Sequence, residues 1–185
     1  MHLFRGLYNE RTQQGSEGLM SDPRIAAIRY APGQSTRPVL DAFVAELKTR
    51  GVNVHGLVQE ATESHGMDAI DLQTGGRIPL KRPTRYESDN KLCSLSLSQL
   101  AEATMVLRRA LDEGADVVVV ERFGKAERDG GGLADELLAL MAGGTPTIVT
   151  VPKEEFEAWQ RFCGGLGDVV DCDLDALLKW WEAST

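Results

Sequence analysis

Short apolar runs alternate along the chain with longer stretches in which apolar residues recur at helical spacing. The runs begin at Ile25, Val52, Val117 and Thr147, and the run at Val117 consists of four consecutive valines. An unbroken β-branched run is typical of a strand that is buried on both faces, as in a parallel sheet covered by helices. The pattern therefore predicts a three-layer α/β fold, with one mainly parallel sheet and helices on both faces.

Helix signals fill most of the intervals between these strands. We expect helices over residues 37–50, 96–113, 133–142, 154–163 and 174–182, and a glycine directly follows each of the first three as a stop. Residues 69–72 and 77–80 flank Gln73-Thr74-Gly75-Gly76, which predicts a small β-hairpin inserted into the α/β pattern.

Length and charge narrow the classes of function. The 185 residues suit one domain, residues 23–185, behind a polar segment, residues 1–22, that lacks the apolar core of a secretory signal and is interpreted as a flexible extension. The formal net charge of -8 argues against DNA as a partner, and no apolar run approaches the ~20 residues of a membrane span. Three cysteines without C-x-x-C spacing favour reduced thiols in a cytoplasmic protein over a zinc site.

Charged residues follow directly on the valine run. Glu121, Arg122, Lys125 and Glu127 stand where the predicted strand ends. Charges at that point lie at the carboxyl edge of the sheet, where open α/β folds bind ligands. These four residues are therefore the first candidates for a functional site, and the alternative is an ordinary solvated turn.

A second candidate follows the first predicted strand, where a Pro-Gly turn leads into a helix through Ser35 and Thr36. A strand, a glycine turn and a helix start together present free amides to an anion. Against the phosphate-binding pattern G-x-x-x-x-G-K-[ST], Gly33 fits the second glycine, but Ile28 replaces the first and Gln34 replaces the lysine. The match is half a motif, and a helix start capped by either hydroxyl explains the same residues. We expect this turn and the acidic strand end to share one edge of the sheet.

A basic segment follows the predicted hairpin. Its cations outnumber its two carboxylates and are Arg77, Lys81, Arg82, Arg85 and Lys91. A basic cluster on an acidic protein favours a small anion over DNA as its ligand. The alternative is a solvated loop.

The order of several segments resembles the THEP1-type nucleoside-triphosphatases, namely APGQST, VHGLVQE, IDLQTGGRI, VVVERFGKAE and PTIVTV. The chain is more closely similar to the bacterial family DUF2478, through GLVQE, DLQTGG, CSLS, RFGKAE and the closing WW. This resemblance covers residues 24–182. It implies a P-loop NTPase-like fold and a relation to proteins often encoded near molybdate-transport genes, and it implies no established reaction.

Two departures from the triphosphatase pattern bear on chemistry. Where the triphosphatases resemble Asp-Glu-Ile-Gly-Lys, with an Asp that supports Mg²⁺ and a Glu that polarises water, this chain has Glu121 and Arg122. The guanidinium of Arg122 stays protonated and cannot act as a general base. Gln34 removes the ammonium that stabilises the transferring phosphoryl group. Because losing one preorganised donor typically costs about 10²–10³ in rate, two such losses predict slow or absent NTP hydrolysis.

Three functions compete on these grounds. The first is a cytoplasmic nucleotide- or oxyanion-binding protein with a degenerate phosphate loop, accessory to molybdate or metal-oxyanion metabolism. The second is an active nucleoside-triphosphatase with a rearranged site, in which Glu127 or Glu60 is the base and Lys125 or Arg122 replaces the missing cation. The third is a non-catalytic interaction module that docks a partner through Trp180-Trp181. Homo-oligomerisation stays open.

The residues assigned to each role follow from these readings. The catalytic candidates are Glu121, Glu127 and Lys125, and Ser35 with Glu121 is the candidate Mg²⁺ pair. The candidate phosphate ligands are Gly33, Gln34, Ser35, Thr36, Arg122, Arg82 and Arg85.

Overall fold

A seven-stranded sheet forms the middle of the molecule, with strand order β4-β3-β2-β5-β6-β1-β7. The computed structural model describes residues 24–63, 66–82 and 97–184. The strands are β1 (Ile25–Tyr30), β2 (Val54–Ala61), β3 (Met67–Asp71), β4 (Arg77–Lys81), β5 (Val117–Val120), β6 (Thr147–Pro152) and β7 (Asp168–Val170). All neighbours from β2 to β7 pair in parallel, whereas β3 is antiparallel to both β2 and β4.

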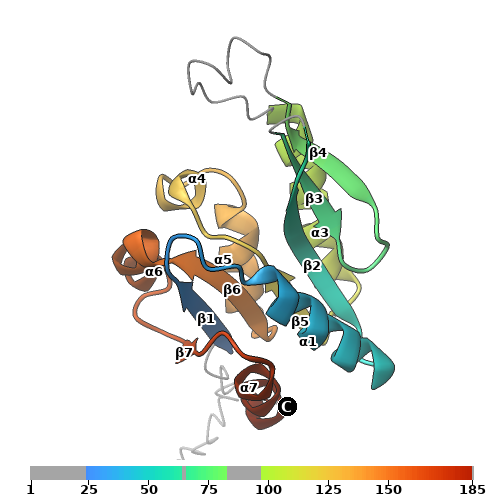
Figure 1. The fold of residues 1–185 in the computed structure, drawn as a ribbon, viewed down its shortest axis with the longest axis vertical. Helices are drawn as coiled ribbons and strands as arrows, with labels where there is room; N and C mark the ends of the chain where they lie inside the picture. Colours follow the sequence, from blue (N-terminus) through green and yellow to red (C-terminus); the bar gives the residue numbers. More distant parts are fainter. Residues whose placement is uncertain (1–23, 64–65, 83–96, 185) are drawn as a thin grey trace, which may run out of the picture.

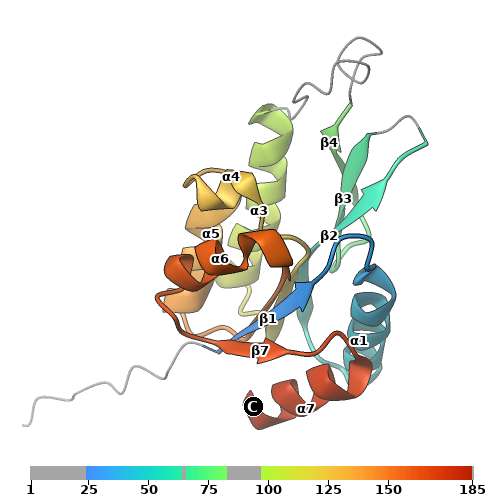
Figure 2. The same cartoon turned by 60° about the vertical axis from the view of Figure 1, so that its left-hand side comes forward.

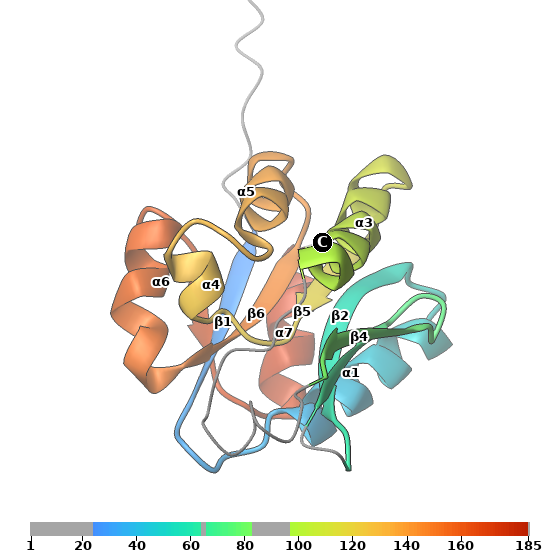
Figure 3. The same cartoon turned by 90° about the horizontal axis from the view of Figure 1, so that it is seen from above.

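Helices cover both faces of this sheet (Figures 1 and 3). They are α1 (Arg37–Thr49), α3 (Leu97–Asp112), α4 (Lys125–Arg128), α5 (Ala134–Ala142), α6 (Phe156–Phe162) and α7 (Leu174–Ser184), with a 3₁₀ turn, η1 (Lys153–Glu155), before α6. Helices α1 and α7 pack on one face, and α3, α5 and α6 pack on the other (Figure 2). The predicted three-layer α/β fold with an inserted hairpin is confirmed.

The valine run of β5 shows why its sequence requires this architecture. Val118 and Val120 face the core under α3, α5 and α6, and Val117 and Val119 face the core under α1 and α7. All four are 0% exposed. A strand with apolar side chains on both faces can be buried only between two layers, and the neighbouring parallel strands supply that setting.

Gly56 of β2 permits an unusually close approach to β5. Its φ is +127, and a methyl group in its place would overlap the backbone of Val119 on the neighbouring strand. Only glycine combines this backbone conformation with the absence of a side chain. The spacing between β2 and β5 therefore depends on this residue.

One predicted helix begins differently in the structure, and several predictions concern residues that the structure does not describe. The helix expected over residues 154–163 begins as the 3₁₀ turn η1, because Pro152 ends β6 immediately before it. The proposed extension, residues 1–22, and the predicted helix start at Ser96 lie outside the described residues, as do Arg85 and Lys91. Across the described part of the chain, no helix is long and apolar enough to span a membrane.

Candidate functional site

Two segments meet at the carboxyl edge of the parallel strands (Figure 1). One is the β1–α1 turn, residues 31–36, and the other is the β5–α4 segment, residues 121–133. The hydroxyl Oγ1 of Thr36 donates to Oε1 of Glu121 at 3.2 Å. The expectation that the two motifs share one edge is confirmed, although β6 separates β1 from β5 and the strands are therefore not neighbours.

The β1–α1 turn is fixed mainly by its own residues. The amide of Gln34 donates to the carbonyl of Ala31 at 3.0 Å, with Pro32 and Gly33 between them. Gly33 has a φ of +82, and this geometry belongs to a type II turn, which favours proline followed by glycine. The side-chain Oε1 of Gln34 also accepts from the Ala31 amide at 3.2 Å, so this side chain folds back onto its own turn.

Helix α1 begins directly after this turn, with Thr36 as its N-cap and Pro38 in the first turn. Neither hydroxyl caps the helix as expected. Thr36 is only 4% exposed and uses its hydroxyl on Glu121, while Ser35 is exposed. Among the described residues, the backbone amides of Gly33, Ser35 and Thr36 donate to no protein acceptor. These amides lie at or just before the N-terminus of a 13-residue helix, which is the setting in which proteins bind anions.

Glu121 joins three elements at the end of β5. Its carboxylate accepts from Thr36 through Oε1 and from the backbone amide of Gln59 in β2, at 2.7 Å, through Oε2. Its own amide donates to the carbonyl of Leu57, which extends the β2–β5 ladder by one step. Arg37 ties the start of α1 to the same point, because its Nη1 donates to the carbonyl of Gln59 at 3.0 Å.

The few oxygen ligands at this edge suit Mg²⁺ better than they suit a metal ion whose ligands all come from protein side chains. No group of three or more His, Cys, Asp or Glu side chains with metal-binding geometry occurs among the described residues. Mg²⁺ characteristically takes one or two carboxylates and completes its shell with water and substrate phosphates. Glu121 with an adjacent hydroxyl fits that pattern. The hydroxyl that the structure brings to Glu121 belongs to Thr36, rather than to Ser35 as expected.

Arg122 is held in a strained conformation beside Glu121. Its φ of 80 makes it the one non-glycine residue with a positive φ in the described chain. The Arg122 amide donates to Oγ1 of Thr150 at 2.7 Å, and the next amide, of Phe123, donates to the Thr150 carbonyl at 2.8 Å. Phe123 then packs edge-on against Trp159 at 5.2 Å. Non-glycine residues in this region are typical of functional sites, because the surrounding structure must hold them there.

Tyr30 is the last residue of β1 and lies at the same carboxyl edge of the sheet. Burial raises the pKa of Tyr30, and the guanidinium of Arg122 acts in the opposite direction, while Glu121 and Glu154 raise it further. Sequence inspection missed Tyr30, Thr150 and Gln59, because a tyrosine at a strand end, a threonine within a β-branched run and a backbone amide carry no recognisable signal.

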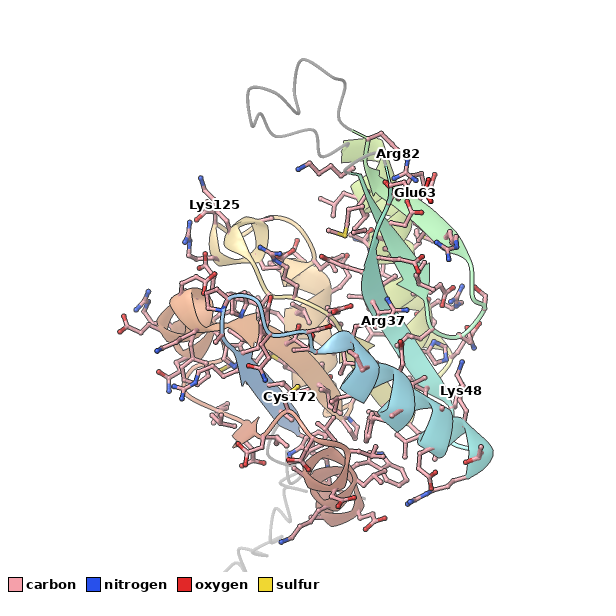
Figure 4. All side chains as sticks on the ribbon, viewed as in Figure 1. Arg37, Lys48, Glu63, Arg82, Lys125 and Cys172 are labelled. Atoms are coloured by element: carbon pink, nitrogen blue, oxygen red, sulfur yellow. The ribbon has the colours of Figure 1, made fainter. Side chains whose placement is uncertain are left out.

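Glu127, a candidate base, is used to fasten its own loop. It is 9% exposed. Its Oε2 accepts from the amide of Gly124 at 3.0 Å and its Oε1 accepts from the amide of Leu133 at 3.1 Å. The first bond is the glutamate half of a capping box at the start of α4. Lys125 is exposed and extends outward from α4 (Figure 4).

The basic hairpin lies apart from the β1–α1 turn. Arg82 pairs with Asp68, and Arg77 pairs with both Glu60 and Asp68. Four strands separate β4 from β1 in the sheet, and Figure 4 shows Arg82 at the upper right, beside the end of β4. The structure therefore does not bring Arg82 to the predicted phosphate site, and it pairs Glu60, the other candidate base, with a cation.

Comparisons with known proteins agree with this architecture. Residues 25–180 match the family model described as "Protein of unknown function (DUF2478)". The chain is 36% identical over 167 residues to "Molybdenum import ATP-binding protein ModC 2" of Bradyrhizobium diazoefficiens; the match covers 87% of this chain and only 18% of that relative. Among solved structures, THEP1 from the hyperthermophile Aquifex aeolicus superposes with a TM-score of 0.60 at 16% identity, over 87% of this chain and 96% of THEP1. This similarity shows a shared fold.

Proposed function

We propose that this chain, which belongs to the DUF2478 family, binds the phosphate groups of a nucleotide, or a similar tetrahedral oxyanion, at residues 33–36. The single observation that carries the proposal is the hydrogen bond from Thr36 to Glu121. It joins half of a phosphate-loop motif to an acidic strand end although the two come from strands that are not adjacent in the sheet. An ordinary capped helix start would require no such contact.

Anion binding at this turn does not depend on the missing lysine. Three backbone amides that find no acceptor among the described residues, together with the dipole of α1, favour negative charge there. Gly33 supports close approach, because nothing lies within 4 Å of where its side chain would begin. Arg122 supplies a positive charge next to Glu121, which accepts from Thr36.

Two side chains beside the proposed anion site would suit a magnesium ion. Glu121 and the Thr36 hydroxyl would hold it, with Ser35 next in sequence, and phosphate oxygens and water would complete its shell. When bound, the ion supplies charge neutralisation for the phosphates. Residues 33–36 bind and orient the anion whether or not the ion is present.

Hydrolysis is proposed to be slow or absent. Gln34 is turned back onto its own turn, and Arg122 cannot accept a proton. Glu127 spends both oxygens on backbone amides, and Glu60 is paired with Arg77. The alternative was an active triphosphatase in which Glu127 or Glu60 is the base. Neither carboxylate is free to take up that role.

The alternative of an interaction module is weakened at one of its two named tryptophans. Trp180 is 9% exposed, and its indole Nε1 donates to Asp168 at 2.9 Å. It packs α7 against the sheet together with Leu177. The similarity to a molybdenum import ATP-binding protein instead supports a role beside the handling of molybdate or related oxyanions.

Calorimetry with ATP, GTP, phosphate and molybdate, each with and without Mg²⁺, tests the proposal. We expect binding by the unmodified chain and at least about tenfold weaker Mg²⁺–ATP binding by Thr36→Val, which replaces the hydroxyl with a methyl group of similar size. Thr49→Val, at the other end of α1, is the matched control and should bind normally. Absence of heat with every anion would overturn the binding proposal, and robust phosphate release that Glu121→Gln abolishes would overturn the proposal on hydrolysis.

A further inference from the structure

A cavity of about 320 Å³ lies on the α3 face of the sheet, behind Glu121. Its walls come from β2, β3, β4, α3 and the β5–α4 segment. The apolar part of the wall is made by Leu57, Met67, Ala69, Leu80, Ala103 and Leu133. The volume falls at the lower end of the range for small-molecule sites, about 300–1,000 Å³.

Small side chains form part of the cavity lining. Ala69 on β3 and Ala103 on α3 belong to it and are each 1% exposed, so they lie at its inner end. Its volume is about ten times the ~30 Å³ that one water occupies in the liquid, and walls of alanine and leucine offer such water few hydrogen bonds. An apolar group that displaced this water would therefore be stabilised.

The charged groups at the cavity favour an anion. The two carboxylates, Glu121 and Glu127, already accept a hydrogen bond on each oxygen from Thr36, Gln59, Gly124 and Leu133. Three cations, Lys81, Arg122 and Lys125, line the same cavity. Within the described part of the chain, the ammonium and guanidinium groups of these three take part in no ion pair. The neighbouring Arg77 and Arg82 contrast with them, since both are paired.

We infer that this cavity binds a small organic anion with a flat or aliphatic apolar body, such as an aryl carboxylate. The body lies against the alanine and leucine wall, and the anionic group faces Lys81 and Arg122, with Lys125 outermost. This site is distinct from residues 33–36, because none of these four residues lines the cavity. Glu121 stands between the two sites, because it lines the cavity and also accepts from Thr36.

Methyl NMR of the full chain with 1-naphthoate as the probe tests this inference. We expect the methyl signals of Ala69 and Ala103 to shift on titration. The neutral isostere 1-naphthalenemethanol should bind at least tenfold more weakly, because it lacks the charge. Equal binding of the neutral alcohol, or no shift of these methyls with naphthoate, would overturn the inference.

Two variants locate the probe. Ala103→Leu fills the cavity and should abolish naphthoate binding, whereas Ala101→Leu, at an exposed position on the same helix, should leave it unchanged. Should Ala103→Leu fail to fold, Lys81→Gln provides the same decision: a fall of about fivefold or more in naphthoate affinity supports the site, and unchanged affinity overturns it. Phosphate titrated in a parallel ¹H–¹⁵N NMR experiment reports on the amides of residues 33–36, so failure of either site is seen separately.

Discussion

The β1–α1 turn and the β5–α4 segment meet at one edge of the sheet, but they are held in opposite ways. Hydrogen bonds between Ala31 and Gln34 fix the turn from within. The β5–α4 segment instead depends on distant partners, because Thr150 holds the Arg122 backbone and Gln59 holds the Glu121 carboxylate. The proposed anion site therefore depends on local backbone geometry, whereas the groups beside it depend on the packing of three strands.

Breaking the contact between β2 and β5 should have the largest effect. Gly56→Ala places a methyl group on the backbone of Val119 at a φ that disfavours any side chain, so we expect a loss of about 3 kcal/mol or more in the free energy of unfolding. Urea denaturation measures it. Gly51→Ala is the control, because it has a similarly positive φ but open space around it, and it should cost only about 1–2 kcal/mol. Equal losses in the two variants would show that strand spacing contributes nothing.

Substitutions of Glu121 and Glu127 should have opposite effects: one should mainly weaken ligand binding and the other should mainly lower the free energy of unfolding. Glu127→Ala leaves the amides of Gly124 and Leu133 without their acceptor, so we expect a loss of about 2–3 kcal/mol in unfolding free energy. Phosphate affinity should stay within about twofold of that of the unmodified chain once the variant is folded. Glu121→Gln should show the reverse pattern, with weaker Mg²⁺–ATP binding and a smaller loss of stability. A strong fall in phosphate affinity in Glu127→Ala would argue against its fastening role.

Relieving the backbone strain at Arg122 should raise the free energy of unfolding and lower the affinity for phosphate. Arg122→Gly removes the left-handed penalty but adds freedom to the unfolded chain, for a net gain of about 0.5–1 kcal/mol in thermal or urea unfolding. Phosphate should bind more weakly, because the nearby positive charge is lost. Arg122→Lys retains charge and strain and should resemble the unmodified chain in both measurements. A destabilised glycine variant would mean that the arginine side chain contributes more through contacts than the backbone loses.

The smallest effect concerns pH and a residue far from the site. His55 near the start of β2 is 0% exposed, and burial lowers its pKa from the ordinary value of 6.5; Arg109 also lowers it, while Glu113, Asp71 and Asp116 raise it. Because the folded state disfavours the proton, stability is full above pH 6.5 and falls as pH decreases from there toward the folded-state pKa. The loss should be below about 1.4 kcal/mol per pH unit. Urea midpoints between pH 5 and 8 measure it, and His55→Asn should flatten the curve without changing phosphate affinity at pH 8.

The order and burial of the strands could be predicted from the sequence alone. The valines at 117–120 leave no polar face to expose, so a covered parallel strand was the only setting that would bury them all. Turn chemistry was equally local, since Pro32-Gly33 prescribes its own backbone geometry. The hairpin followed from glycines at 75 and 76 between two short strands.

Residue roles at the site were decided by tertiary contacts. Glu127 looked like a free acid in the sequence, yet folding places two backbone amides at its oxygens. Arg82 looked like a phosphate ligand, yet it pairs with Asp68 four strands away from the turn. Spacing along a chain does not specify which groups from other strands will satisfy a carboxylate or a guanidinium.

The sequence by itself thus determined the layers, the buried strands and the phosphate-type turn, because periodicity and glycine conformation act over a few residues. Only the tertiary structure decided that Thr36, rather than Ser35, reaches Glu121, and that β6 lies between their strands. It also decided that Thr150 supports the strained Arg122. Strand order and side-chain partners depend on packing between segments that are distant in the chain. Thr36 and Glu121, for example, are more than 80 residues apart, and no local sequence pattern predicts that they meet.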